Sequence, residues 1–289
     1  MALVGAAFIW GATFVVVKHA LESSSTLLFL ALRFTLGAAV LAVLARRQWT
    51  SLPNKPLAWR AGLLTGGALF FGYLFQTLGL RLTTPAKSGF ITAFSVVLVP
   101  IVGAALFRLR VSWNAWLGVI LAAAGLYLLL APSGIGQWNR GDLLTLLCAV
   151  AFAFHVPLVG RYTASVGAGV LTTLQVGLVA LVSMACWWWA EPAWLHWNGP
   201  YAAAVVVTAL FPTALCFSIQ SWAQQYTSPT QTALILTLEP VFAWLTSYLV
   251  LGEVLGTGGF AGAALILGGI VLSEMKPGEP AAASHQMER

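Results

Sequence analysis

Long apolar runs, each about as long as a bilayer is thick, follow one another along most of the 289-residue chain. About 20 consecutive apolar residues cross the hydrocarbon core of a membrane as an α-helix. The breaks between the runs are short and contain turn-forming residues, so no loop is long enough to fold as a separate domain. The pattern predicts an all-α integral membrane protein with ten transmembrane helices, near residues 2–20, 26–45, 58–80, 86–107, 113–131, 142–161, 168–190, 200–222, 229–250 and 255–273.

The composition supports a membrane protein and argues against a nucleic-acid-binding one. Hydrophobic residues make up 60% of the chain and charged residues 8%, whereas about a quarter of a soluble domain is charged. The formal charge is +6, but the basic residues are scattered between apolar runs, so membrane topology explains them better than a phosphate-binding patch. The first run begins at the N-terminus without a charged segment before it, and we interpret it as a retained span.

The distribution of lysine and arginine predicts the orientation, because cytoplasmic loops carry an excess of both. A cytoplasmic N-terminus puts nine of them inside and four outside, with Arg33 left out because it lies within a span. The inner residues are Arg46, Arg47, Lys55, Arg60, Arg108, Arg110, Arg161, Lys276 and Arg289, and the outer ones are Lys18, Arg81, Lys87 and Arg140. We therefore expect a multi-pass protein of the cell inner membrane with both termini in the cytoplasm.

An internal repeat divides the chain into two halves. The segment "LTTPAKSGFI" at 82–91 resembles "YTSPTQTALI" at 226–235, and the hydropathy of five spans recurs in the next five. We expect repeats at 1–137 and 138–275, followed by a polar cytoplasmic tail at 276–289. Because five is odd, the second half enters the membrane from the opposite side. Such inverted repeats are typical of secondary transporters, which bind substrate near the midplane, where the repeats meet.

Several segments resemble the drug/metabolite transporter superfamily, in its ten-helix, twice-repeated branch of amino-acid and metabolite exporters. They are "IWGATFVVVKHAL" at 9–21, "LRFTLGAAVLAVL" at 32–44, "GFITAFSVVLVPIVGAAL" at 89–106, "TLEPVFAWLTSYLVLGEVL" at 237–255 and "GAALILGGIVL" at 262–272. The resemblance covers nearly the whole chain and implies helices around a central cavity. The first half departs from the second: it has "LVPIVGA" and "FRLRV" where the second has "LEPVFAW" and "LGEVL", so the acidic residue is not duplicated.

Prolines and polar side chains inside the spans indicate which helices surround the cavity, because freed backbone groups in a membrane need partners or water. The prolines are Pro100, Pro157, Pro212 and Pro240. The fifth and tenth spans carry small residues instead, among them Gly258 and Gly262 in a G-x-x-x-G pattern, which fits packing within the chain or a homodimer contact. The candidate substrate-binding and cavity residues are Trp10, Thr13, Tyr73, Gln76, Phe94, His155, Gln175, Gln220, Glu239 and Trp244.

Most candidates also allow a structural interpretation. His155 could bind substrate or satisfy backbone near Pro157, and Gln76 and Gln220 could gate the path or bridge helices. The aromatic candidates, Trp10 and Trp244 among them, could stack on substrate or fill the core. Arg33 could bind a carboxylate, or it could extend to the membrane surface and anchor the helix.

Glu239 and Pro240 form a pair in the middle of an apolar run. Proline frees a carbonyl near Leu236, and a protonated glutamate could donate to it, so we favour a latch at a kink. The alternative is a site for a substrate amine or a proton.

The sequence predicts a secondary transporter that exports small metabolites, with amino acids or related compounds favoured by the family resemblance. Efflux of cationic or hydrophobic drugs is the alternative within transport, and a lipid-handling enzyme or scaffold is the alternative from another class. Walker-type, H-E-x-x-H and G-x-S-x-G motifs do not occur, and we expect no enzymatic activity, cofactor or metal. The expected partners are a small-molecule substrate and membrane lipids, with no nucleic acid.

The predicted topology can be tested by labelling from the two sides of the membrane. Single cysteines at Ser51 and Asn198, in an otherwise cysteine-free chain, should react with an impermeant thiol reagent from opposite sides. Labelling from the same side would contradict the inverted ten-helix arrangement.

Overall fold

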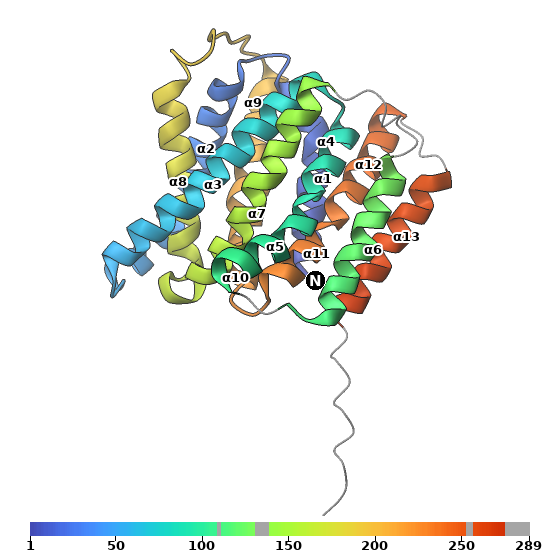
Figure 1. Cartoon of the computed structure of the whole chain (residues 1–289). Coiled ribbons are helices and arrows are strands. Elements are labelled where there is room, and N and C mark those ends of the chain that lie inside the picture. Colours follow the sequence, from blue (N-terminus) through green and yellow to red (C-terminus); the bar gives the residue numbers. More distant parts are fainter. Residues whose placement is uncertain (109–110, 131–138, 253–256, 275–289) are drawn as a thin grey trace, which may run out of the picture.

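The computed structural model describes residues 1–108, 111–130, 139–252 and 257–274. All regular elements in these ranges are helices, as the all-α prediction requires. The polar tail expected at 276–289, the boundary near 137 and most of "LGEVL" lie outside the described residues. In chain order the elements are α1 (Ala2–Ala20), α2 (Thr26–Thr50), α3 (Lys55–Leu82), α4 (Pro85–Ala93), α5 (Ser95–Phe107), α6 (Trp113–Leu130), α7 (Arg140–Val166), α8 (Ala168–Cys186), α9 (Gly199–Thr208), the π-helix η2 (Ala209–Leu215), α10 (Cys216–Ala223), α11 (Pro229–Leu236), α12 (Leu238–Leu251) and α13 (Thr257–Glu274) (Figure 1).

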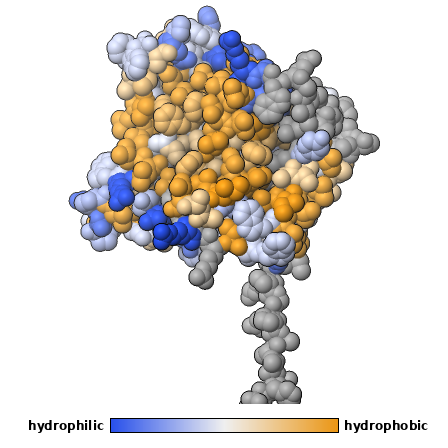
Figure 2. Space-filling model, viewed as in Figure 1, coloured by the Kyte–Doolittle hydropathy of each residue, from blue (hydrophilic) through white to orange (hydrophobic). Residues whose placement is uncertain are grey.

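Eight stretches of the described chain are long and apolar enough to cross a membrane. Five are the single helices α1, α2, α3, α7 and α8, and three are the interrupted spans α4–α5, α9–η2–α10 and α11–α12. The other two predicted spans correspond to α6 and α13, whose apolar stretches at 113–125 and 260–272 are shorter. Hydrophobic residues cover the middle of the face seen in Figure 2, and hydrophilic residues gather towards its ends, as expected for a protein surrounded by lipid.

Two spans are broken at corresponding places in the two halves. α4 and α5 are separated by Phe94, and α11 and α12 by Thr237. Each broken span starts with a hydroxyl residue followed by proline, and the hydroxyl oxygen of Thr84 or Ser228 caps the first turn. The similar segments at 82–91 and 226–235 therefore form equivalent helix starts.

The break at Thr237 lies where the expected kink at Pro240 should be. Pro240 has no N–H to donate to the carbonyl oxygen of Leu236, four residues earlier, and α11 ends at Leu236. The hydroxyl of Thr237 donates to the carbonyl oxygen of Leu234 at 2.5 Å, which helps to satisfy the last turn of α11.

α6 and α13 pack along each other with their backbones in close contact (Figure 1). A methyl group added at Gly125 would lie 2.5 Å from the carbonyl oxygen of Gly262, and one at Gly269 would lie 2.6 Å from that of Gly118. The small residue Gly262 of the G-x-x-x-G pattern therefore packs within the chain. A homodimer stays a prediction.

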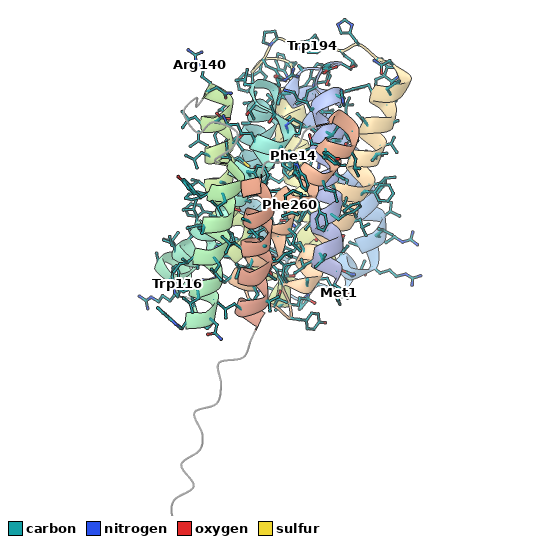
Figure 3. All side chains as sticks on the ribbon, turned by 90° about the vertical axis from the view of Figure 1, so that its right-hand side faces the viewer. Met1, Phe14, Trp116, Arg140, Trp194 and Phe260 are labelled. Carbon is teal, nitrogen blue, oxygen red and sulfur yellow. The ribbon has the colours of Figure 1, made fainter. Side chains whose placement is uncertain are left out.

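Polar side chains tie the helices together at the end of the molecule marked by Arg140 and Trp194, opposite Met1 (Figure 3). Asp142, in the first turn of α7, forms a capping box with Asn139. Its carboxylate also accepts hydrogen bonds from the Thr83 hydroxyl at 2.8 Å and from the Lys87 ammonium at 2.6 Å. One buried carboxylate thus links the C-terminal end of α3, the start of α4 and the start of α7.

The 191–199 loop does more than connect two spans. The carboxylate of Glu191 accepts hydrogen bonds from the backbone N–H groups of Thr26 and Leu27, at the start of α2. Backbone bonds from Ser25 N to Trp194 O and from His196 N to Ser23 O hold the loop in place. A side chain from the second half of the chain thus caps the second helix of the first half.

Asp142→Asn should destabilise the fold, because removing one partner of a buried ion pair costs about 3–5 kcal/mol. Lys87 is only partly buried, so we expect a cost at the lower end of this range. We expect a fall in melting temperature of roughly 5–10 °C for the detergent-solubilised protein. Glu22→Gln, which removes an exposed carboxylate paired with His19, is the matched control and should leave the melting temperature unchanged. Equal melting temperatures for the two variants would contradict the structural role of Asp142.

Candidate functional site

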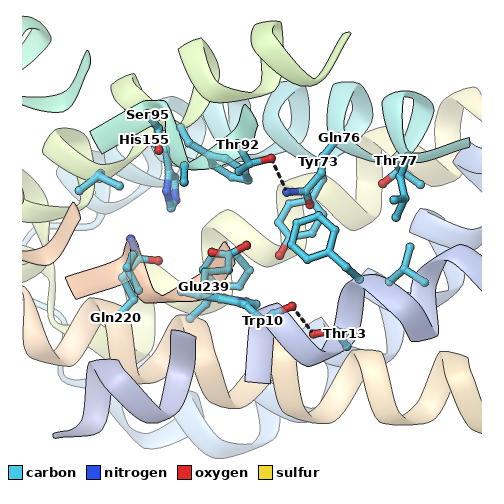
Figure 4. A pocket seen from close by; sticks show the side chains of 18 of the residues that line it. Trp10, Thr13, Tyr73, Gln76, Thr77, Thr92, Ser95, His155, Gln220 and Glu239 are labelled. Atoms are coloured by element: carbon cyan, nitrogen blue, oxygen red, sulfur yellow. Dashed lines mark hydrogen bonds between the residues drawn. The ribbon is translucent and has the colours of Figure 1, made fainter. Parts of the chain in front are cut away.

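A cavity lies between helices of both halves of the chain (Figure 4). Its volume is about 80 Å³, which is room for several waters or one small solute. Side chains from α1, α2, α3, α4, α5, α7, α10, α11 and α12 line it, together with Thr237 between the last two. α6 and α13 contribute no described residue to this wall.

Seven of the ten sequence candidates line the cavity, and their roles in binding stay predictions. They are Trp10, Thr13, Tyr73, Gln76, His155, Gln220 and Glu239. In Figure 4, Trp10, Glu239 and Gln220 lie on one side of the open space, and Gln76, Thr92 and His155 lie on the other. The structure thus brings together residues that are as far apart in sequence as Trp10 and Glu239.

The other three candidates lie elsewhere. Phe94 is exposed at the break between α4 and α5. Trp244 packs against Tyr248 and Phe260, between α12 and α13. Gln175 is buried and contacts His155 from behind the cavity wall. Their apolar or polar character indicated a place inside the membrane, but the rotation of each helix directs them away from the cavity.

Two side chains satisfy backbone carbonyl groups in the interrupted span α9–η2–α10. Pro212 has no N–H, and the hydroxyl of Thr213 donates instead to the carbonyl oxygen of Thr208 at 2.8 Å. The indole Nε1 of Trp10 donates to the carbonyl oxygen of Pro212 at 2.8 Å. Trp10 therefore lines the cavity and also satisfies a carbonyl group of the π-helix. Filling of the core alone does not describe its role.

Arg33 is a cavity residue whose role the sequence left open between binding a carboxylate and anchoring at the membrane surface. Its side chain is only 3% exposed, so it does not extend to the membrane surface. Nε donates to the Thr213 hydroxyl at 2.8 Å, and the guanidinium lies 4.8 Å from the centre of the Tyr73 ring. The feature of the sequence that could have identified Arg33 as a cavity residue was its charge, because an ionisable residue within a span is by default a candidate for function.

Glu239 is placed by a close approach of α12 to α1. A methyl group at Gly11 would lie 2.5 Å from the carbonyl oxygen of Glu239 and 2.8 Å from the N of Ala243. The side chain of Glu239 lines the cavity and keeps accessible surface there. Among the described residues, no hydrogen-bond partner of its carboxyl group is found, and the latch to a freed carbonyl stays a prediction.

The opposite wall is a hydrogen-bonded network of polar side chains. His155 shares a 2.7 Å hydrogen bond with Oε1 of Gln175, whose Nε2 donates to the Ser221 hydroxyl at 3.3 Å. This bond joins His155 to a side chain and not to the backbone near Pro157, which was one of its two possible roles, and binding of substrate stays a prediction. Gln76 donates to the Thr92 hydroxyl at 3.3 Å and so bridges α3 and α4.

Other lining residues were missed because nothing in a single sequence marks them. They are Phe14, Val17, Thr77, Leu80, Thr92, Ala93, Ser95, Phe152, Val156, Phe217, Ala233, Leu236 and Thr237. Threonine and aromatic residues are common throughout these spans. Only the packing of the helices separates those that face the cavity from those that face lipid.

The EamA-like transporter family model matches the chain twice, over residues 1–131 and 139–275. The chain belongs to the EamA-like transporter family. The resemblance to the drug/metabolite transporter superfamily is thereby confirmed, and the protein is a membrane transporter.

Relatives support the family assignment. An "Uncharacterized transporter" of Archaeoglobus fulgidus is 33% identical over 270 residues, which cover 93% of this chain and 83% of the relative. The "Uncharacterized inner membrane transporter YedA" of Escherichia coli is 26% identical over 178 residues, or 61% of this chain and 58% of YedA. A solved structure described as "Crystal structure of protein" has a TM-score of 0.77 at 22% identity, covering 94% of this chain and 95% of the other, which shows a shared fold.

The contact at Gly11 gives a matched pair of variants on α1 of this EamA-family protein. Gly11→Ala should force α12 away from α1, since overpacking typically costs about 1–3 kcal/mol, and so displace Glu239 and lower both thermal stability and transport. Gly5→Ala is the control, because a methyl group there meets nothing within 4 Å. If Gly11→Ala melts and transports like Gly5→Ala, the close approach is not needed to place Glu239.

Proposed function

We propose that this EamA-family protein is a secondary transporter that exports small metabolites, amino acids or related compounds foremost, by alternating access. It works in the cell inner membrane with both termini in the cytoplasm. The observation that carries the proposal is a small polar and aromatic cavity enclosed by helices from both halves of the chain. Transporters built from inverted repeats bind their substrates at such a place.

Three further observations support two inverted halves, residues 1–137 and 138–275. The family model matches each half separately. The two broken spans, α4–α5 and α11–α12, have equivalent positions and similar capped starts. The packing also follows the repeat. α1 packs on α12, and α7, the equivalent of α1 in the second half, packs on α5, which belongs to the equivalent of the α11–α12 span. α2 packs on its own equivalent α8, and α6 packs on its own equivalent α13. Each half supplies residues to both walls, so rocking of one half against the other would open the cavity to alternate sides.

The orientation is supported by charge and by the placement of the chain ends. Met1 lies at the opposite end of the molecule from Arg140 and Trp194 (Figure 3). The exposed arginines Arg46 and Arg47, late in α2, belong to the larger basic group that cytoplasmic loops carry. The Escherichia coli relative YedA is named as an inner membrane transporter.

Efflux of cationic drugs is the second candidate function. It is favoured by Glu239, a carboxylate without a partner among the described residues, in a cavity that also contains Trp10. Arg33 in the same cavity opposes it, because a cationic ligand would leave a like charge nearby.

The proposal is tested with purified protein in proteoliposomes. We expect uptake of one or more radiolabelled amino acids by counterflow, above protein-free liposomes and reduced in Gly11→Ala relative to Gly5→Ala. Ethidium transport without amino-acid counterflow would favour drug efflux instead. Transport of neither by a folded protein would contradict both candidates.

A further inference from the structure

One acidic and one basic side chain line the same cavity without pairing to each other. Arg33 comes from α2 in the first half and Glu239 from α12 in the second. Among the described residues, the ion pairs within 4.0 Å are His19–Glu22 and Lys87–Asp142, so neither cavity charge belongs to one. Charges inside a membrane are costly, and those that are kept there are paired or functional.

The guanidinium of Arg33 is fixed in place but not saturated. Thr213 accepts from Nε at 2.8 Å, and Tyr73 Oη is a distant acceptor for Nη2 at 3.4 Å. No acceptor for Nη1 is found among the described residues. All of these partners are neutral, so the charge of Arg33 is not compensated by them. A carboxylate is the group that best takes two parallel N–H bonds from arginine.

Glu239 supplies the complementary charge. It is the only carboxylate among the described residues that line the cavity, and Arg33 is the only lysine or arginine there. The carboxylate accepts no hydrogen bond from any described residue and has accessible surface in the cavity. An ammonium group would supply both the charge and the donors that it lacks.

We propose that the cavity selects zwitterions, with Arg33 binding the carboxylate of the ligand and Glu239 binding its ammonium group. This inference rests on the proposed function and names the recognition elements of the same site. A ligand with one charge satisfies one residue and leaves the other uncompensated, so the site discriminates against simple amines and simple acids. Neutral walls such as Tyr73, Phe152 and Phe217 then face the remainder of the ligand.

The ligand set that separates these chemistries is a panel of protein amino acids, each with its decarboxylated amine and its deaminated acid. For phenylalanine the three compounds are L-phenylalanine, phenethylamine and 3-phenylpropionate. Binding is measured by calorimetry on the detergent-solubilised full chain. We expect at least one amino acid to bind roughly 10- to 100-fold more tightly than its own amine and acid, the range given by losing one charged hydrogen-bonded contact.

Charge-removing variants assign the two ends of the ligand. Glu239→Gln should weaken binding of the amino acid roughly 10- to 100-fold while leaving that of the matching acid unchanged or tighter. Arg33→Gln should show the reverse preference, for the amine over the acid. The matched controls are Glu22→Gln and Arg46→Gln, which remove exposed charges outside the cavity and should bind as the wild type does.

Each result bears on the proposal. Binding of an amine or an acid as tightly as the amino acid, wild-type binding by Glu239→Gln, or no amino-acid binding at all would overturn the zwitterion site. If Arg33→Gln does not fold, Glu239→Gln and the wild-type panel decide the question. Amino-acid binding without counterflow in proteoliposomes contradicts the proposed transport but leaves the zwitterion site standing, so the two failures are distinguishable.

Discussion

Every backbone N–H and C=O group within the bilayer must find its partner inside the protein, and the arrangement of this molecule follows from that constraint. Its spans are interrupted where a cavity is needed, at Phe94, at Thr237 and around Pro212. Trp10 and Thr213 satisfy carbonyls at the π-helix, and Thr237 satisfies one at the end of α11. Trp10 and Thr237 also line the cavity, so the groups that repair the broken helices are part of its surface.

The same network fixes Arg33, the one arginine among the described residues that line the cavity. Thr213 donates to a backbone carbonyl and accepts from Arg33, so the position of the guanidinium depends on the interruption at Pro212. Glu239 is held differently, by the contact between its backbone and Gly11 of α1. The two charges thus have rigid supports from different helices, which favours a site with preformed geometry over one that assembles around its ligand.

The regions outside the cavity divide between close packing and polar anchoring. α6 and α13 approach each other through glycines, which allow van der Waals contact between backbones where no hydrophobic effect drives helices together. At the end near Arg140, Asp142 and Glu191 join helix ends from both halves through hydrogen bonds and an ion pair. These features leave the central helices as the part of the fold with interrupted backbone and uncompensated charge.

The sequence by itself determined the membrane class, the helical content and the approximate position of each span, because these depend on the length and hydropathy of local segments. It also placed Glu239 inside the membrane, because this residue lies in the middle of an apolar run that is long enough to cross the bilayer. Tertiary structure decided which residues meet. Trp10 lines the cavity whereas Trp244 does not, Gln220 does whereas Gln175 lies behind it, and Arg33 is turned inward towards Thr213. These outcomes depend on the rotation of each helix and on contacts between residues as distant in sequence as Arg33 and Thr213, which the pattern along one segment does not contain.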